Sequence, residues 1–280
     1  MDLIDVHTHI MHPKIAEKAI AQLEDHYGIG PKGTGMAGDL LTRMEAGGIH
    51  RAVVHTAATA PAQVIPANNW ALEIKENFER LIPFGTVHPG YEKWEQELDR
   101  LEARGILGIK LHPDFQGIWL DDPNLYSVLE AVQGRFMVMV HVGDDLPPEK
   151  NPSCPRKLAE ILDSFPNLTV IAAHLGGYRQ WDLALEFLAG RKVYLDTSSS
   201  LPFIPTDLLA KIVNRHSRER LLFGSDYPLF DPGREWERLR NNPAFDSGLI
   251  RQMQNNALAL FECTIPVGVE EVDLKNKCGS

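Results

Sequence analysis

Eight short runs rich in Val, Ile, Leu and Phe recur along the chain, separated by segments with helical periodicity. Each run has the length and composition of a strand that is buried on both faces. In one separating segment, Trp94, Leu98 and Leu101 fall on the same helix face at i, i+4 and i+7. Eight alternating strand and helix units predict a single-domain α/β fold, the (β/α)8 or TIM barrel. The predicted strands span residues 2–9, 51–57, 81–88, 106–112, 136–143, 168–174, 192–197 and 221–227.

Turn residues agree with this assignment. Gly105 precedes a predicted strand, as a helix-ending glycine does, and Asp122 offers an N-cap before Pro123 at a helix start. An open doubly wound sheet is the alternative, but it should carry a glycine-rich phosphate turn after its first strand. Residues 8–13 read Thr-His-Ile-Met-His-Pro instead. The glycine-rich residues 28–38 follow no predicted strand, so we expect a mobile loop there over the barrel mouth.

Length and charge limit the class of protein. A chain of 280 residues that is 44% hydrophobic can bury a large core. We expect the barrel over residues 1–263 and a C-terminal tail over residues 264–280. The net charge of -10, without a basic run, argues against nucleic acid and membrane as partners and favours a small-molecule substrate.

Fewer sequence features bear on the cellular compartment and the oligomeric state. The chain has no apolar run of membrane-spanning length, which favours a cytoplasmic protein. Its three cysteines are far apart and lack CxxC spacing, which argues against a cysteine-based zinc site. The sequence leaves a homodimer open.

Chemically active side chains gather at the predicted carboxyl ends of the strands, where a (β/α)8 barrel builds its active site. His7 and His9 project from the same side of their strand, with Val6 and Thr8 turned away. His141 ends an apolar run in which an unpaired polar ring would cost about 1–3 kcal/mol. The other titratable residues at predicted strand ends are His55, His88, Lys110, His112, His174, Asp196 and Asp226.

Each of these residues also has a structural interpretation. Asp226 could cap a turn, but in a closed barrel it lies beside the first strand, which favours a metal ligand or a general base. His174 is open as a metal ligand, an acid-base group or a core histidine, and we favour the first two. Lys110, on the same strand face as His112, could bind an anion, become a carbamylated metal ligand or reach solvent. A structural or hydrogen-bonding role is favoured for His55, His88 and Asp196.

The ordered set of motifs resembles the amidohydrolase superfamily, in the branch that includes aminocarboxymuconate-semialdehyde decarboxylase. No single motif is decisive, but together they extend through nearly the whole chain. They are DVHTH at 5–9, LLTRMEAGGI at 40–49, GIKLHP at 108–113, His141, AHLGG at 173–177, GSDYP at 224–228 and NALALF at 256–261.

The resemblance implies a metal site at the barrel rim. In the one-metal form a single divalent ion, expected to be zinc, lies beside His174. In the two-metal form of the superfamily a carbamylated lysine and a histidine of strand six hold a second ion, and Lys110 and His174 occupy those positions. The sequence context of Lys110 favours the one-metal form. The implied ligands of the first ion are His7, His9, His141 and Asp226.

The predicted activity is hydrolysis of a C–N or C–O bond in a small molecule by a metal-activated water. Asp226 and His174 are the expected catalytic residues, because each can accept a proton and return it to the leaving group. The expected substrate-binding residues are Lys110, His112 and Arg234.

Two other function classes are weighed against hydrolysis. A non-oxidative decarboxylase or hydratase would use the same metal site and would need cations for a substrate carboxylate, for which Arg179 and Arg234 are candidates. A non-catalytic ligand-binding barrel is disfavoured because a structural metal site has no need of His174. The aromatic residues expected either to line the pocket or to serve in packing are Phe115, Trp119 and Tyr227.

Overall fold

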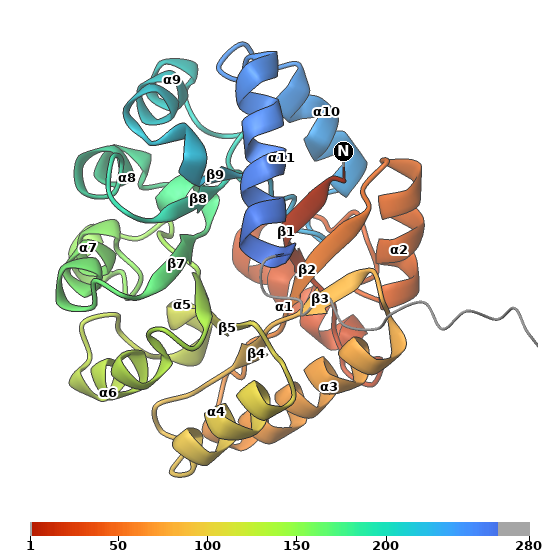
Figure 1. Cartoon of the computed structure of the whole chain (residues 1–280), viewed down its shortest axis with the longest axis vertical. Coiled ribbons are helices and arrows are strands. Elements are labelled where there is room, and N and C mark those ends of the chain that lie inside the picture. The colour runs from red at the N-terminus through yellow and green to blue at the C-terminus, as the bar shows by residue number, and fades with distance from the viewer. Residues whose placement is uncertain (1, 263–280) are drawn as a thin grey trace, which may run out of the picture.

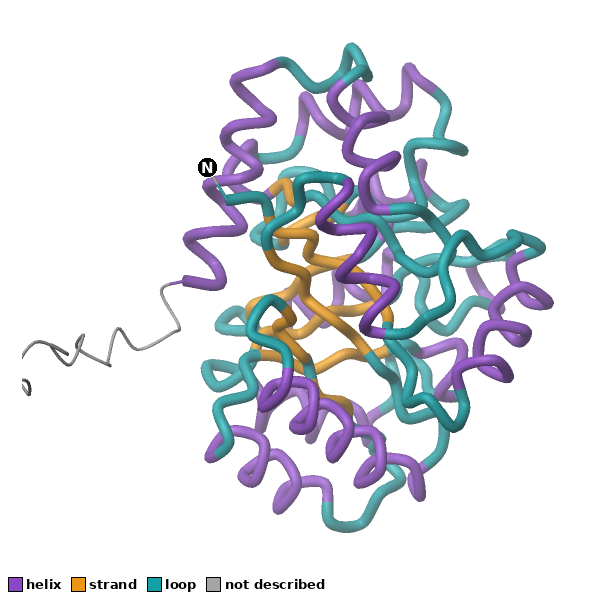
Figure 2. Tube along the Cα trace, turned by 90° about the vertical axis from the view of Figure 1, so that its right-hand side faces the viewer, coloured by secondary structure: helices purple, strands orange, loops and turns teal. Residues whose placement is uncertain are grey.

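The computed structural model describes residues 2–262, which form a (β/α)8 barrel with its strands inside a ring of helices (Figures 1 and 2). All eight predicted strands are present, and the third is divided at Phe84 into two short strands. The strands are β1 (Ile4–His9), β2 (Arg51–His55), β3 (Leu81–Pro83), β4 (Gly85–Thr86), β5 (Gly108–Leu111), β6 (Met137–Val140), β7 (Thr169–Ala172), β8 (Tyr194–Asp196) and β9 (Leu221–Leu222).

Parallel pairing follows the order of the strands along the chain. β1, β2 and β3 form one ladder, and β4 to β9 form another. The backbone amide of Phe84 donates to the carbonyl of Val54 at 3.0 Å, beside the break between the ladders. The amide of Val6 donates to Phe223 O at 2.9 Å, and that of His9 donates to Tyr227 O at 2.7 Å. These bonds join the first strand to the last and close the barrel.

Helices and short 3-10 turns connect the strands, and the predicted caps are confirmed. The side chain of Asp122 accepts from the amide of Asn124 at 2.8 Å, with Pro123 as the first helical residue. Gly105 follows a helix with a φ of 66°. The helices are α1 (Ala16–Tyr27), α2 (Ala37–Ala46), α3 (Val64–Asn77), α4 (Trp94–Ala103), α5 (Pro113–Gln116), α6 (Pro123–Val132), α7 (Pro155–Ser164), α8 (Trp181–Phe187), α9 (Thr206–Arg215), α10 (Pro232–Arg240) and α11 (Ser247–Glu262). The 3-10 turns are η1 (Pro61–Gln63), η2 (Pro148–Lys150), η3 (His174–Gly176) and η4 (Arg218–Arg220).

Two apolar clusters make up the core. The larger one fills the space between strands and helices, and the smaller one fills the barrel interior. Ala257 and Phe261 of α11 pack into the interior cluster beside Ile4 and Phe84. An apolar plug therefore fills the amino-terminal end of the barrel, and polar side chains occupy the other end.

A bulge in β1 sets the direction of its two histidines. The pairing of β1 with β2 shifts register between Asp5 and Thr8, and Val6 lies in the interior cluster. Simple alternation would turn Val6 away from the side that His7 occupies. That part of the prediction is wrong, because Val6 also faces the barrel interior. His7 and His9 do share one side, with their Nε2 atoms 3.1 Å apart. The bulge lets an apolar side chain and the histidines above it all face the interior.

The glycine-rich stretch forms a loop that packs on the segment after β9. The amides of Lys32 and Gly33 donate to the carbonyl of Pro228 at 2.7 and 3.0 Å. The Tyr227 hydroxyl accepts from the amide of Gly35 at 3.1 Å. A Cβ atom at Gly33 would lie 2.1 Å from the Tyr227 ring, so only glycine fits there. The predicted loop thus lies over one side of the barrel mouth, and its last two residues belong to α2.

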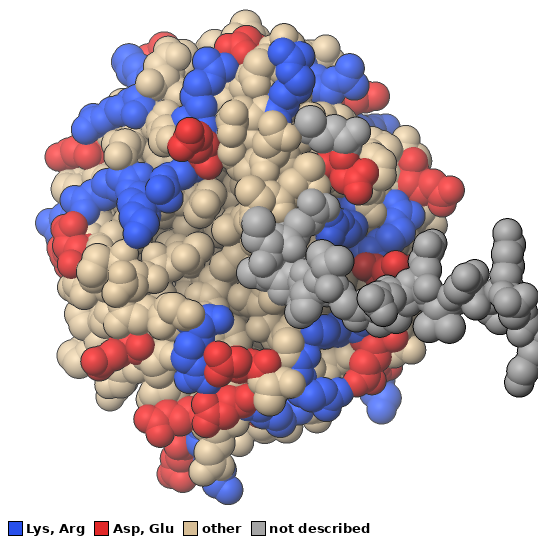
Figure 3. Space-filling model, in the orientation of Figure 1, with Lys and Arg blue, Asp and Glu red and all other residues tan. Residues whose placement is uncertain are grey.

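Several other sequence predictions concern the surface and the ends of the chain. In the described part of the chain, none of the helices is both long and apolar enough to cross a membrane. Basic and acidic side chains are interspersed on the face drawn in Figure 3. The predicted tail, Cys263 and Cys278 lie outside the described residues, whereas Cys154 is buried.

Close packing of α2 against α10 gives a stability prediction. A Cβ atom at Gly47 would lie 2.6 Å from the Cα of Gly233. We therefore expect Gly47→Ala to lower the free energy of unfolding by about 1–3 kcal/mol, because two backbones would have to separate. Gly38→Ala is the matched control: its Cβ meets nothing within 4 Å, so it should be neutral or slightly stabilising. Urea denaturation would measure both changes, and equal effects would contradict the close-packing argument.

Buried His216 makes the fold sensitive to acid. Its Nε2 donates to Val193 O at 3.0 Å, and burial lowers its pKa from 6.5 to about 4. Between these values the unfolded state binds the proton and the folded state does not, so stability falls as pH drops from 6.5 towards 4. The shift corresponds to roughly 3 kcal/mol. We expect His216→Gln to remove this part of the loss when denaturation at pH 7.5 is compared with denaturation at pH 5. An unchanged difference between the two pH values would contradict the assignment.

Candidate active site

Three predicted metal ligands meet at the carboxyl end of the barrel. The Nε2 atoms of His7 and His9 lie 3.5 and 3.3 Å from Oδ1 of Asp226. β1 supplies both histidines, and Asp226 follows β9, which the barrel closure places beside β1. Asp226 has a φ of 67°, a strained conformation for a residue with a side chain. Its other carboxylate oxygen, Oδ2, accepts a hydrogen bond from the Ser199 hydroxyl.

Hydrogen bonding assigns the proton of His7 and leaves one nitrogen bare. The Nδ1 of His7 lies 3.0 Å from Oδ2 of the buried Asp196, so Nδ1 carries the hydrogen. The lone pair of Nε2 therefore points towards His9 and Asp226. A carboxylate that orients a histidine in this way is typical of metal ligands. Asp196 therefore has a hydrogen-bonding role, because it orients the ring of His7.

The charge state of this cluster also suits a divalent cation. Burial lowers the pKa of His7 well below its ordinary value and also lowers that of His9, so both rings are neutral. Burial alone would raise the pKa of Asp226, but its histidine neighbours, including a hydrogen bond with His9 that a neutral ring can donate, bring that pKa below the usual range. Two neutral imidazoles and one carboxylate are a donor set that zinc and manganese accept.

His141 and His174 form a second pair with facing nitrogens. His141 Nε2 lies 2.9 Å from Gly143 O, and His174 Nδ1 lies 3.0 Å from Ser198 O. Carbonyl oxygens only accept, so both of these nitrogens carry hydrogens. The remaining nitrogens, His141 Nδ1 and His174 Nε2, face each other at 3.0 Å. If both rings are neutral, both of these nitrogens present lone pairs, which repel each other at this distance. A proton shared between them or a nearby cation removes the repulsion.

Lys110 lies against the first histidine of β1. Its side chain is fully buried, and Nζ is 3.2 Å from His7 Nε2. Burial lowers the pKa of Lys110 to about 8. An ammonium group this close would compete with a metal ion for the lone pair of His7. A neutral or chemically modified Lys110 is therefore the form compatible with metal at His7 and His9.

His112 and Asp114 make a further group with His141, but its geometry does not favour a metal ion. The rings of His112 and His141 are stacked 4.0 Å apart with an interplanar angle of 11°. Lone pairs of parallel stacked rings run side by side and do not converge on one point. Oδ2 of Asp114 is 3.9 Å from His141 Nε2 and accepts from the Ser153 hydroxyl at 2.7 Å.

The two remaining rim histidines have hydrogen-bonding roles. His55 is buried, and its Nε2 donates to Val6 O at 3.0 Å. His88 is half-buried, and its Nε2 donates to Gln116 O at 3.1 Å. Neither is among the ligand groups that the described residues form.

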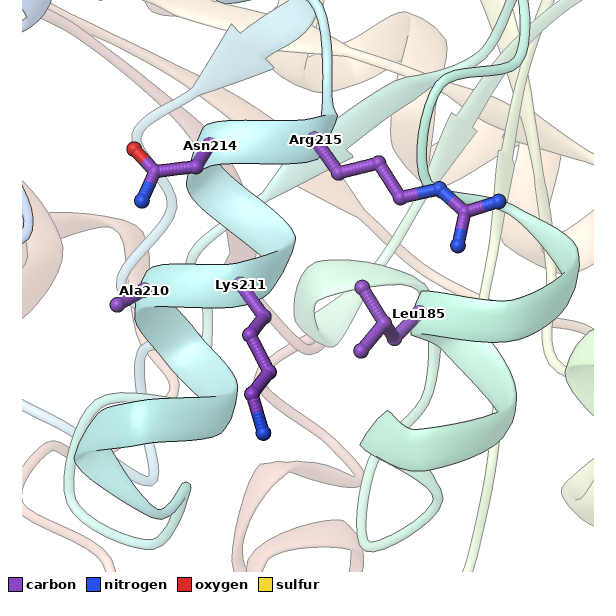
Figure 4. A pocket seen from close by; sticks show the side chains of 5 residues that line it. All are labelled: Leu185, Ala210, Lys211, Asn214 and Arg215. Carbon is purple, nitrogen blue, oxygen red and sulfur yellow. The ribbon is translucent and has the colours of Figure 1, made fainter.

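A small pocket adjoins the metal-ligand cluster. Polar atoms of Asp226, His174 and His141 meet apolar walls there, which is the usual composition of a small-molecule site. A separate surface hollow between α8 and α9 lies among outer helices and shares no lining residue with the pocket (Figure 4). The pocket is lined by Tyr27, Ile29, His141, His174, Tyr178, Ser199, Asp226 and Leu229.

The sequence did not indicate most of the apolar walls of this pocket. The three aromatic residues proposed for it lie elsewhere: Tyr227 is fully buried, Trp119 packs under Lys157, and Phe115 stacks on His112 at 4.2 Å. Tyr178 and Ser199 each follow a strand-end motif by a few residues, a signal that could have been used. The other wall residues lie at a helix end or in loops and carry no periodic pattern. They are Tyr27, Ile29 and Leu229.

The two candidate arginines lie in different surroundings. The guanidinium of Arg179 is 4.4 Å from the ring centre of Phe203 and 5.4 Å from that of Tyr178, which lines the pocket. Arg234 is exposed in the first turn of α10. Within residues 2–262 no side chain pairs with the Arg234 guanidinium, and the structure does not bring it to the cluster.

A (β/α)8 barrel with buried histidine and carboxylate donors beside a pocket at its carboxyl rim defines the chain as a barrel enzyme. The amidohydrolase family model matches residues 4–261. The chain therefore belongs to the amidohydrolase family, as the motifs predicted, and the non-catalytic alternative is set aside. No curated protein matches the sequence.

Solved structures with the same fold have low sequence identity. An uncharacterised TIM-barrel protein from Bordetella bronchiseptica has a TM-score of 0.76 at 18% identity, over 94% of this chain and 99% of its own. A dihydroxybenzoic acid decarboxylase from Polaromonas sp., solved with manganese and 2-nitroresorcinol, has a TM-score of 0.70 at 16% identity, over 95% and 98%. 5-Carboxyvanillate decarboxylase from Sphingomonas paucimobilis has 0.69 at 14%, over 93% and 99%.

Proposed function

We propose that this chain is a metal-dependent, non-oxidative decarboxylase of a small aromatic carboxylic acid. The observation that carries the proposal is the convergence of His7, His9 and Asp226 beside a pocket that also contains His174. Several proteins of the same fold are aromatic acid decarboxylases. They support the decarboxylase alternative better than the hydrolysis that the sequence first predicted.

The proposed ligands are His7, His9 and Asp226, with His141 as the fourth through its bare Nδ1. A divalent ion bound there would supply positive charge that stabilises negative charge developing on the substrate. Zinc was the first expectation, but a similar decarboxylase was solved with manganese, so the proposal covers either ion. A second ion at Lys110 and His174 stays a prediction.

The reaction needs one proton, and His174 is placed to deliver it. Decarboxylation breaks the bond between the ring carbon and the carboxylate, releases CO2 and leaves the electron pair on carbon. That carbon must then receive a proton. His174 Nδ1 is held by Ser198 O, so Nε2 is the atom that can carry a proton in the pocket. The apolar walls limit the access of water during this step.

The substrate carboxylate needs a cationic partner, and the arginines differ in position. We expect Arg179→Ala to raise KM for a carboxylated substrate by about 10-fold or more, since charged hydrogen bonds contribute about 1.5–3 kcal/mol. Arg234→Ala, which the sequence pattern also placed in substrate binding, should have the smaller effect because its side chain is exposed. Steady-state kinetics of both variants would decide. A larger increase in KM for Arg234→Ala would assign carboxylate binding to Arg234.

The proposed activity is tested by assaying CO2 release from a panel of benzoates with hydroxyl and methoxy substituents. Esters and amides of the same acids are assayed in parallel. CO2 release that is lost in the His9→Ala variant supports the proposal. Ester or amide turnover without CO2 release would return the chain to the hydrolases.

A further inference from the structure

Tyr27, the last residue of α1, forms part of the pocket wall. Its ring packs edge-on against Phe115 and Tyr178, with centroids 6.0 and 5.7 Å away. Its hydroxyl oxygen lies 3.2 Å from Nε2 of His112. Within the described residues, this is the one hydrogen bond that the Tyr27 hydroxyl makes.

The hydrogen bonds of His112 decide which partner donates in this contact. The amide of Phe115 donates to Nδ1 of His112 at 3.4 Å. An amide can only donate, so Nδ1 must present its lone pair there. The hydrogen of the imidazole is then on Nε2, because a histidine ring carries at least one hydrogen on nitrogen. His112 Nε2 therefore donates to the Tyr27 oxygen.

This assignment leaves the hydroxyl hydrogen of Tyr27 free. The phenol oxygen already accepts from His112, and its own O–H finds no acceptor among residues 2–262. A donor that lines a pocket without a partner is available to a ligand in that pocket. The packed rings of Phe115 and Tyr178 hold the phenol in place, so little freedom is lost when a ligand binds.

We propose that Tyr27 is a specificity-determining residue whose hydroxyl donates a hydrogen bond to an oxygen atom of the bound substrate. The inference rests on the proposed decarboxylase function, because it takes the ligand to be a carboxylic acid. Asp226 and His174 lie in the same pocket as Tyr27. The substrate class is therefore a planar acid that presents a hydroxyl or similar oxygen acceptor to Tyr27 when its carboxylate faces the reacting groups.

The first test asks which nitrogen of His112 carries the hydrogen. Nitrogen-15 NMR of the full chain, labelled at histidine and loaded with diamagnetic zinc, distinguishes the two tautomers, and the His112→Gln spectrum assigns the signal. We expect hydrogen on Nε2. Hydrogen on Nδ1 alone would make Tyr27 the donor to His112, leave nothing for a substrate and overturn the proposal.

The second test measures the hydrogen bond itself with matched ligands. In a His174→Asn background, which is expected to slow turnover about 100- to 10,000-fold, calorimetry compares benzoate with 2-, 3- and 4-hydroxybenzoate. We expect Tyr27→Phe to weaken the best hydroxybenzoate about 3- to 10-fold relative to benzoate, the range of one neutral hydrogen bond. Tyr126→Phe, a half-buried tyrosine of α6, is the matched control and should change neither ligand.

The outcomes separate this inference from the proposed function. If the benzoates bind and Tyr27→Phe weakens all of them equally or not at all, Tyr27 does not bond to the hydroxyl oxygen of the substrate. The inference is then wrong. If none of the four acids binds to the wild-type chain, the proposed aromatic substrate class fails, and the role of Tyr27 fails with it even if Nε2 carries the hydrogen.

Discussion

Asp226→Asn is expected to lose the bound metal ion and to lower turnover by at least about 100-fold. The carboxylate is the only negative charge that lies directly against both His7 Nε2 and His9 Nε2 in the described cluster. An amide of the same shape removes that charge and a strong oxygen donor, and even partners behind the ligands commonly affect metal affinity 10- to 100-fold. Elemental analysis after purification without chelators, together with CO2 release, measures both effects.

The control for this prediction is Asp207→Asn, which removes an exposed carboxylate of α9 far from the strand ends. It should keep both metal and activity. Full metal content in Asp226→Asn would show that the three-donor cluster is not the metal site. Unfolding curves of the two variants should be compared, so that loss of the ion is not confused with loss of the fold.

Elemental analysis also gives the number of metal ions bound per chain. About one ion per chain in the wild type, lost in His7→Ala but retained in Lys110→Ala, is the result expected for the one-metal form. About two ions per chain, falling to about one in Lys110→Ala, would show that Lys110 is a ligand. Lys110 is fully buried beside His7, so Lys110→Met, which keeps most of its volume, is the better second variant.

The strand-end residues were predictable because a parallel barrel imposes one geometry on all of them. Strand ends gather at one rim, and the closure of the barrel brings Asp226 from the last strand to His7 on the first. Residues in this position can be read from the sequence without any knowledge of the loops. The direction of Val6 was not predictable, because a bulge changes the alternation and leaves no mark in a short apolar run.

Pocket residues depend on the paths of loops, which periodicity does not encode. Tyr27 lies at the site as the last residue of α1, where Gly28, with a φ of 63°, caps the helix and turns the chain. Arg179 and Arg234 look equivalent in the sequence, since each follows a strand end. The structure separates them by packing: Arg179 lies against Phe203 and the pocket residue Tyr178, and Arg234 is on the exposed face of a helix.

His174→Asn is expected to lower the rate of CO2 release by about 100- to 10,000-fold while the metal content and the affinity for substrate stay near wild type. Asparagine places an amide close to the position of Nδ1, so the bond to Ser198 O can persist. It places nothing at Nε2, where the proton is carried. Because binding and metal ligation are otherwise intact, the loss should be in kcat rather than in KM.

His216→Gln is the matched histidine control, since that side chain is buried away from the pocket and bonds only to backbone. Its turnover at neutral pH should equal that of the wild type. If His174→Asn instead loses a metal ion along with activity, His174 is a ligand, and the two-metal form explains why its Nε2 faces His141 Nδ1 at 3.0 Å. If kcat is unchanged, the proton reaches the substrate carbon from another group.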